Sequence, residues 1–68
     1  DAFVSMDTQD CFLLVRTIPG NAFAFGSLID NSNFDSVFGA ISGDDTVLII
    51  CRSNEEALHL KNHFIQLI

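Results

Sequence analysis

Four short segments of the chain have the hydrophobic patterns of β-strands. Residues 2–7 (AFVSMD) alternate between two sides with the period of a half-buried strand, and residues 11–18 (CFLLVRTI) form the nearly continuous apolar run of a central strand. Residues 37–42 (VFGAIS) and 46–52 (TVLIICR) are rich in β-branched or aromatic residues. In the first strand, one side is expected to carry Ala2, Val4 and Met6, and the other Phe3, Ser5 and Asp7.

Turn-forming residues separate these strands into two pairs. DTQD at residues 7–10 predicts a hairpin between the first two strands, and the Pro19-Gly20 pair ends the second strand. The short spacing at SGDD predicts a second tight hairpin, in which Gly43 takes a positive φ and Asp44 is a favourable turn residue.

Two helices complete the pattern. Residues 21–31 (NAFAFGSLIDN) have helical spacing, with Phe23 and Asp30 sharing a flank beside the apolar face. Ser53 followed by Glu56 is a capping box, so a second helix should begin there. The predicted core faces of the two helices are Ala22, Phe25, Leu28 and Ile29, and then Ala57, Leu60, Phe64, Leu67 and Ile68. The outer side of the last helix is predicted to carry His59, Asn62, His63 and Gln66.

The resulting order, ββαββα, predicts an α+β fold in one domain. A four-stranded antiparallel sheet with two helices on one face satisfies the pattern and leaves the other face free for a partner. A core formed by 68 residues supplies only about 3–5 kcal/mol of net stability. Because 49% of the residues are apolar and mean hydropathy is +0.37, we expect an oligomer that buries the surplus apolar surface.

The charge balance points to a cationic ligand. The net charge is −6, and the only basic residues are Arg16, Arg52 and Lys61, which argues against direct contact with nucleic acid or anionic lipid. No apolar run reaches the roughly 18 residues that span a bilayer, so no membrane association is expected and a cytoplasmic location is predicted.

Several other features have ordinary structural explanations. Cys11 and Cys51 lie in apolar runs and are interpreted as small hydrophobic residues, with a disulfide or a reactive thiol as the less favoured alternative. His59 and His63 are four residues apart, but a metal site needs further ligands, so no metal and no cofactor is predicted. No nucleophile has a base placed beside it, and the chain is not expected to be an enzyme.

The acidic pair at SGDD carries the most specific candidate chemistry. A hairpin turn explains Gly43 and Asp44 but not Asp45. The similar GDD of nucleic-acid polymerases holds magnesium, but that chemistry needs more carboxylates and a basic channel. The third interpretation is recognition of a guanidinium or ammonium group, for which carboxylates are the matching acceptors. If the segment is extended, Asp44 and Asp45 point in opposite directions and face two groups or two subunits.

The succession TIPGNA, a helix ending near LID, and FGAISGDDTVLIICR closely resembles the C-terminal domain of bacterial arginine repressors. The resemblance implies that residues 1–68 are a DCoH-like ligand-binding and oligomerisation domain, with a winged-helix domain that binds operator DNA preceding it in the whole protein. It also implies trimers that pair into a hexamer and L-arginine bound as corepressor between trimers.

The resemblance further implies a set of ligand-binding positions. Asp44 and Asp45 match the acidic pair that meets the arginine head groups, and Asp30 matches a further acidic contact. Ala22 and Ser42 match positions that contact the ligand through the backbone.

Two further positions depart from the family pattern. Phe23 stands where glutamine is common, and Ala40 where threonine is common. Since a lost partner in a buried polar site costs about 1–3 kcal/mol, the two departures are expected to weaken arginine binding by roughly two to four orders of magnitude. The alternative is therefore an oligomerisation module with reduced or lost arginine sensing that acts with a paralogous subunit.

Overall fold

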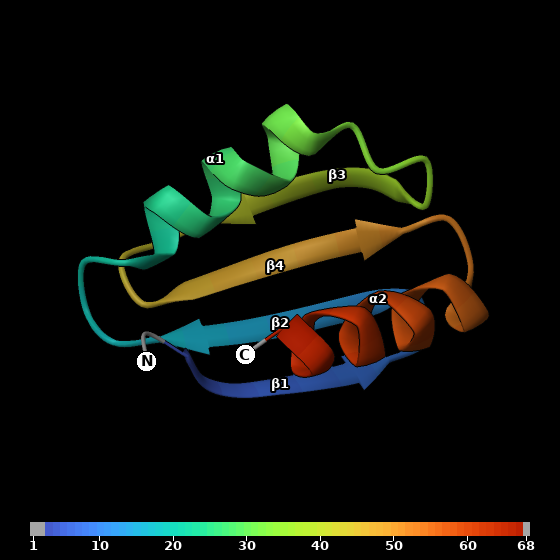
Figure 1. Cartoon of the computed structure of the whole chain (residues 1–68), viewed down its shortest axis with the longest axis horizontal. Helices are drawn as coiled ribbons and strands as arrows, with labels where there is room; N and C mark the ends of the chain where they lie inside the picture. The colour runs from blue at the N-terminus through green and yellow to red at the C-terminus, as the bar shows by residue number, and fades with distance from the viewer. Residues whose placement is uncertain (1–2, 68) are drawn as a thin grey trace.

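The computed structural model describes residues 3–67 and has the predicted ββαββα order (Figure 1). The six elements are β1 (Phe3–Gln9), β2 (Phe12–Thr17), α1 (Ala22–Ser32), β3 (Val37–Ser42), β4 (Thr46–Cys51) and α2 (Asn54–Leu67). All neighbouring strands are antiparallel, in the order β1-β2-β4-β3, so both predicted hairpins and the central position of residues 11–18 are confirmed.

Both helices lie on one face of the sheet, as predicted (Figure 1). Helix α1 packs on β3 and β4, while α2 packs mainly on β1 and β2. The core lies between the helices and the sheet, and its strand residues are those that point to the helix side. They are Leu13 and Val15 of β2 and Val47, Ile49 and Cys51 of β4.

Aromatic rings join the two helices across this core. Phe25 of α1 makes edge-to-face contacts with Phe3, at a centroid distance of 4.9 Å, and with Phe64 of α2, at 5.2 Å. Phe34 continues the cluster from Phe64 at 5.9 Å. This cluster contains four of the seven phenylalanines, and it packs α1 against α2, although the two helices are far apart along the chain.

The first strand departs from the predicted alternation. A register shift between Phe3 and Ser5 breaks the period, so that both Phe3 and Met6 pack against the core. Val4, expected to share a side with Met6, is 66% exposed, and that prediction is wrong. Ala2 lies outside the described residues.

Helix α1 buries a different set of residues from the one predicted. Ala22, Phe25 and Ile29 are buried as expected, but Leu28 is 57% exposed. Gly26, which the prediction did not include, is buried and lies against Ser42 of β3 so closely that an added Cβ would overlap the serine hydroxyl. The helix ends at Asn33, whose φ of 52° is a left-handed conformation that asparagine tolerates.

Helix α2 begins as predicted, with one half of the capping box. Ser53 Oγ accepts a hydrogen bond of 3.1 Å from the Glu56 amide. The reciprocal bond to the Glu56 side chain is not formed, because Glu56 Oε2 is buried without a hydrogen-bond partner among the described residues. That half of the predicted capping box is wrong. Ala57, Leu60 and Phe64 are buried as predicted, whereas the side chain of Leu67 and all of Ile68 lie outside the described part of the chain. The predicted outer residues, His59, Asn62, His63 and Gln66, are exposed.

Candidate functional site

The two aspartates of SGDD are the two loop residues of the β3–β4 hairpin. Ser42 pairs with Val47, and Gly43 N–H donates a 2.7 Å hydrogen bond to the Thr46 carbonyl, which closes the loop around Asp44 and Asp45. The segment is therefore a turn and not an extended strand. The alternation of an extended strand, from which opposite directions of the two side chains were predicted, does not apply to it. The positive φ expected at Gly43 is also wrong, since among the described glycines it occurs at Gly20, with a φ of 90°.

The backbone of this turn is fixed by the loop that leads into α1. The Asp44 carbonyl accepts hydrogen bonds from the amides of Gly20, at 3.0 Å, and Ala22, at 3.3 Å. The Asp45 carbonyl accepts one of 2.8 Å from Thr17 N–H at the end of β2. Because both carbonyls are held, the backbone that carries the two carboxylates has a defined position in the β3–β4 hairpin, which lies at the left end of the molecule in Figure 1.

Both carboxylates are exposed and lack a cationic partner among the described residues. Asp45 Oδ1 accepts a 2.9 Å hydrogen bond from the neighbouring Thr46 hydroxyl. Arg52 is occupied elsewhere, since its Nε donates 3.0 Å to the Asp35 carbonyl and its guanidinium lies 5.5 Å from the Phe38 ring centre. Within residues 3–67, the Thr46 hydroxyl is therefore the one hydrogen-bond donor to the two carboxylates, and neither forms an ion pair.

The start of α1 lies beside the acidic pair. Asn21 precedes the helix without a side-chain capping bond, and the Ala22 amide is used by Asp44. Within the described part of the chain, the next amides, those of Phe23 and Ala24, have no acceptor, as is usual for a first helical turn. Carboxylate acceptors and free amide donors are therefore neighbours, and together they suit a ligand that carries both charges.

The structure brings together five of the seven predicted site residues. Ala22, Phe23, Asp44 and Asp45 meet at the hairpin, and Ser42 joins them through its contact with Gly26. The five differ in exposure: Ala22 is fully buried, whereas the Phe23 side chain is 73% exposed.

The other two predicted residues lie further away. Ala40 is half-buried against the core, two residues before Ser42 on the same face of β3. Asp30 lies eight positions after Ala22 in the helix, which is about 12 Å along the axis. A shallow hollow of about 190 Å³ at that end is lined by Asp30, Asn33 and Phe38 among others.

Sequence reasoning missed Gly26, Thr17 and Gly20 as parts of this site. Gly26 had a visible signal, because a glycine inside a helical pattern indicates close packing. Thr17 and Gly20 act only through their backbone amides, so no residue pattern could have revealed them.

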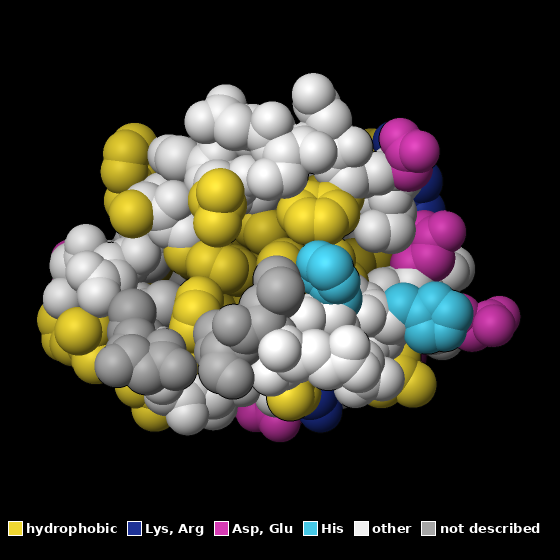
Figure 2. All heavy atoms as spheres, viewed as in Figure 1, with side chains coloured by type: hydrophobic (Ala, Val, Ile, Leu, Met, Phe, Trp, Pro, Cys, Tyr) yellow, Lys and Arg dark blue, Asp and Glu magenta, His cyan; other side chains and the backbone are white. Residues whose placement is uncertain are grey.

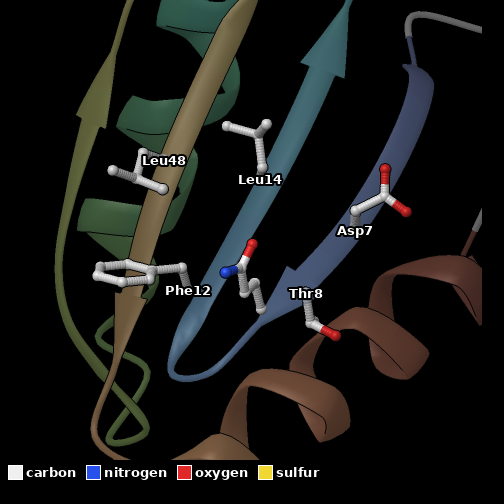
Figure 3. Close-up of a pocket in the computed structure, with 6 residues that line it drawn as sticks. Asp7, Thr8, Phe12, Leu14 and Leu48 are labelled. Carbon is white, nitrogen blue, oxygen red and sulfur yellow. The ribbon is translucent and has the colours of Figure 1, made fainter.

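The sheet face opposite α1 carries another hollow. This groove, of about 280 Å³, is lined by Asp7, Thr8, Gln9, Phe12, Leu14 and Leu48 (Figure 3). Figure 3 shows Phe12, Leu14 and Leu48 standing on this face of β2 and β4, with α1 behind the strands. Phe12 is 40% exposed and Ile41 of β3 is 64% exposed, so the open face presents apolar side chains to solvent.

On the helix-covered side, apolar side chains remain visible between the two helices, and the two histidine side chains lie at the surface (Figure 2). No set of three or more potential metal ligands comes together in residues 3–67. Helices long and apolar enough to cross a membrane are absent from the same residues.

An exposed acidic pair with a fixed backbone thus lies beside open helix amides, on a small domain whose other sheet face is uncovered. The family model described as "Arginine repressor, C-terminal domain" matches residues 1–66. The chain belongs to this family. It is 47% identical over 68 residues to the arginine repressor of Oceanobacillus iheyensis, 46% to that of Bacillus subtilis and 44% to that of Staphylococcus aureus.

These alignments cover 100% of this chain and 45% to 46% of the relatives, so the chain spans a little less than half of their length. The resemblance noted in TIPGNA and FGAISGDDTVLIICR is confirmed, and it extends over nearly all of the chain. Membership in a family of repressors also agrees with the prediction that the chain is not an enzyme.

Proposed function

We propose that this chain is the effector-binding and hexamerisation domain of an arginine-responsive transcriptional regulator. L-Arginine acts as corepressor and binds where trimers meet, and operator DNA is contacted by a winged-helix domain that precedes this one in the whole protein. The backbone-fixed position of Asp44 and Asp45, which have no cationic partner among residues 3–67, is the observation that carries this proposal.

The chemistry of the site matches the two ends of free arginine. Carboxylates accept the several N–H donors of a guanidinium or the ammonium group, often in pairs. The amides of Phe23 and Ala24 at the positive end of the α1 dipole suit the ligand carboxylate. Because the turn is held by three backbone hydrogen bonds, little ordering is needed when the ligand binds.

The uncovered sheet face supports assembly. Among its apolar residues, Phe12 and Ile41 are exposed in one subunit, and Leu14, Leu48 and Ile50 are incompletely buried. Burying them against other copies would supply the stability that a 68-residue core lacks. Ligands that bridge subunits then tighten the hexamer by mass action, which couples arginine concentration to DNA binding.

Calorimetric titration with L-arginine, repeated with L-citrulline, tests the ligand. Citrulline replaces the guanidinium by a neutral urea group, so we expect heat with arginine and little with citrulline. Asp45→Asn keeps an acceptor for Thr46 but removes the charge, and a charge-assisted hydrogen bond of about 1.5–3 kcal/mol predicts a roughly 10- to 100-fold weaker affinity. Sedimentation of the same samples should show that the assembly of this variant dissociates at a higher protein concentration than that of the unmodified protein.

Asp10→Asn is the matched control for Asp45→Asn. Asp10 is also an exposed turn aspartate, but it lies in the β1–β2 hairpin, and its φ of 54° suits asparagine equally well. The substitution Asp10→Asn removes one negative charge, as Asp45→Asn does, and should leave arginine affinity unchanged. Equal losses in the two variants would show that only net charge matters and would exclude a specific acidic site.

A constitutive oligomerisation module is the second candidate, favoured by Phe23 and Ala40. Neither side chain can donate or accept a hydrogen bond, and Ala40 is half-buried against the core. In that case the domain assembles without arginine, with itself or with a paralogous subunit. An absence of heat at millimolar arginine, together with an assembly that does not respond to arginine, would select this candidate.

A further inference from the structure

Two free cysteines face one another across the central strands. Phe12 pairs with Ile50 and Leu13 with Ile49 in the β2–β4 ladder. The next pair in that register is Cys11 with Cys51, and Cys51 N–H donates a 2.8 Å hydrogen bond to the Cys11 carbonyl. The two residues are therefore direct cross-strand neighbours, although 39 residues separate them in the sequence.

This placement meets the distance requirements of a disulfide. Directly opposite residues in a hydrogen-bonded antiparallel pair have Cα atoms about 5.5 Å apart, and disulfides occur at Cα separations of about 4.4–6.8 Å. Opposite residues also point to the same face of a sheet. Leu13 and Ile49, the next pair with that orientation, are both buried on the helix side, so the two thiols face the same layer.

We propose that Cys11 and Cys51 form a reversible intramolecular disulfide that joins β2 to β4. A low-molecular-weight disulfide such as oxidised glutathione is the oxidant. The Cys11 thiolate attacks one of its sulfurs, releases one glutathione thiolate and forms a mixed disulfide. Cys51 Sγ then attacks Cys11 Sγ and releases the second glutathione, so two cysteine thiols are oxidised and one glutathione disulfide is reduced to two thiols.

The environments of the two thiols assign their order of reaction. Cys11 lies at the end of the β1–β2 turn and is half-exposed, which gives the oxidant access. Cys51 is only 3% exposed, and burial raises the pKa of its thiol, with Cys11 and Glu56 raising it further. Cys51 is therefore protected from bulk oxidants and reacts with the neighbour that the ladder places against it.

This pair is separate from the proposed arginine site. The cysteines lie where β2 begins and β4 ends, whereas Thr17 and Asp45 lie at the other ends of the same strands. In Figure 1 the cysteine end is at the right and the acidic hairpin at the left. The disulfide is expected to stiffen the sheet without changing the acidic turn, so its test does not depend on arginine.

Oxidation of the native protein with glutathione disulfide, followed by mass spectrometry, tests the proposal. We expect the titratable thiols of this domain to fall from two to none, with the loss of two hydrogen atoms in mass and no added glutathione. Trypsin cleaves after Arg16 and Arg52, which places Cys11 and Cys51 in two different peptides. Those peptides should be recovered as one linked species that dithiothreitol separates.

A thermal melt measures the consequence of the link. A disulfide restricts the unfolded chain, so oxidation should raise the midpoint by about 5 °C or more, reversibly with reductant. Cys11→Ser should abolish this rise and leave Cys51 unmodified, because Cys51 alone is shielded. Cys51→Ala should leave Cys11 carrying one glutathione.

Three results would overturn the proposal. They are a stable mixed disulfide at Cys11 in the unmutated protein, a disulfide formed only between two chains, or two thiols that remain free in the folded state. Each would show that the thiols of one chain do not meet, and reducing and non-reducing gels separate the second result from the expected one.

Discussion

Gly26→Ala tests how closely α1 lies on β3 beside the acidic turn. An added Cβ would overlap Ser42 Oγ and lie 3.2 Å from Ser42 Cβ. Overpacking of this kind costs about 1–3 kcal/mol, whereas replacing a helical glycine by alanine returns about 1 kcal/mol. The net loss is therefore about 0–2 kcal/mol, which corresponds to about 4–8 °C in melting midpoint for each kcal/mol.

The double variant Gly26→Ala, Ser42→Ala removes the overlapping hydroxyl and leaves the gain in helix propensity. We expect it to recover at least the stability of the unmodified protein, so a double-mutant cycle should give a coupling energy of about 1–3 kcal/mol, which is the whole cost of the overlap. Gly39→Ala in β3 is the control, because a Cβ there meets nothing within 4 Å. It should leave the midpoint unchanged or raise it.

Thermal melts at a fixed protein concentration supply these values, since assembly makes the midpoint depend on concentration. A coupling energy near zero would refute the reasoning, because it would mean that the Ser42 hydroxyl does not rest on Gly26. The helix would then sit further from β3, and Ser42 would not belong to the same surface as Ala22.

Three further predictions concern the core, the cap of α2 and the buried thiol. Phe25→Leu loses two edge-to-face contacts and should lower the free energy of unfolding by about 1–3 kcal/mol. Phe23→Leu, on the exposed side of the helix, should change the stability of one subunit by less than about 0.5 kcal/mol, and thermal melts measure both effects. Ser53→Ala removes the acceptor for the Glu56 amide and should cost about 1 kcal/mol in a denaturant titration; an unchanged midpoint would refute the cap. Burial raises the pKa of Cys51 in the folded state, so the unfolded chain releases this proton at a lower pH than the folded chain does. Stability should therefore fall as the pH rises past the usual value of 9.0, and Cys51→Ala should reduce this dependence of stability on pH.

The fold followed from the sequence because its signals are local. Strand length, the Pro19-Gly20 and SGDD turns, and the cap at Ser53 each depend on neighbouring residues, and the structure retains all of them. The errors arose where distant contacts decide the outcome. Gly26 is buried because α1 approaches Ser42 of a later strand, while Leu28 is exposed, and the register shift after Phe3 redirected Val4 through pairing with β2.

The candidate site was predictable in part for the same reason. Asp44 and Asp45 stand out in the sequence as two adjacent negative charges, and a hairpin turn was expected to explain only the first of them. The structure shows that both are loop residues, so turn formation explains each of them, and their special feature is the set of hydrogen bonds that fixes their carbonyls. Those bonds come from backbone amides of a loop more than 20 residues away, which a residue pattern cannot encode.

The distance between Asp30 and the acidic turn bears on how the proposed ligand site is built. Within one subunit, Asp30 lies about 12 Å along α1 from Ala22, which is itself bonded to Asp44. A ligand held by the turn and the first amides of α1 would have to span this distance to reach Asp30 of the same subunit. If arginine contacts Asp30 as well, the residue has to come from another subunit, so Asp30→Asn should weaken arginine binding only in assembled protein. An equal effect in protein diluted to single subunits would contradict a shared site.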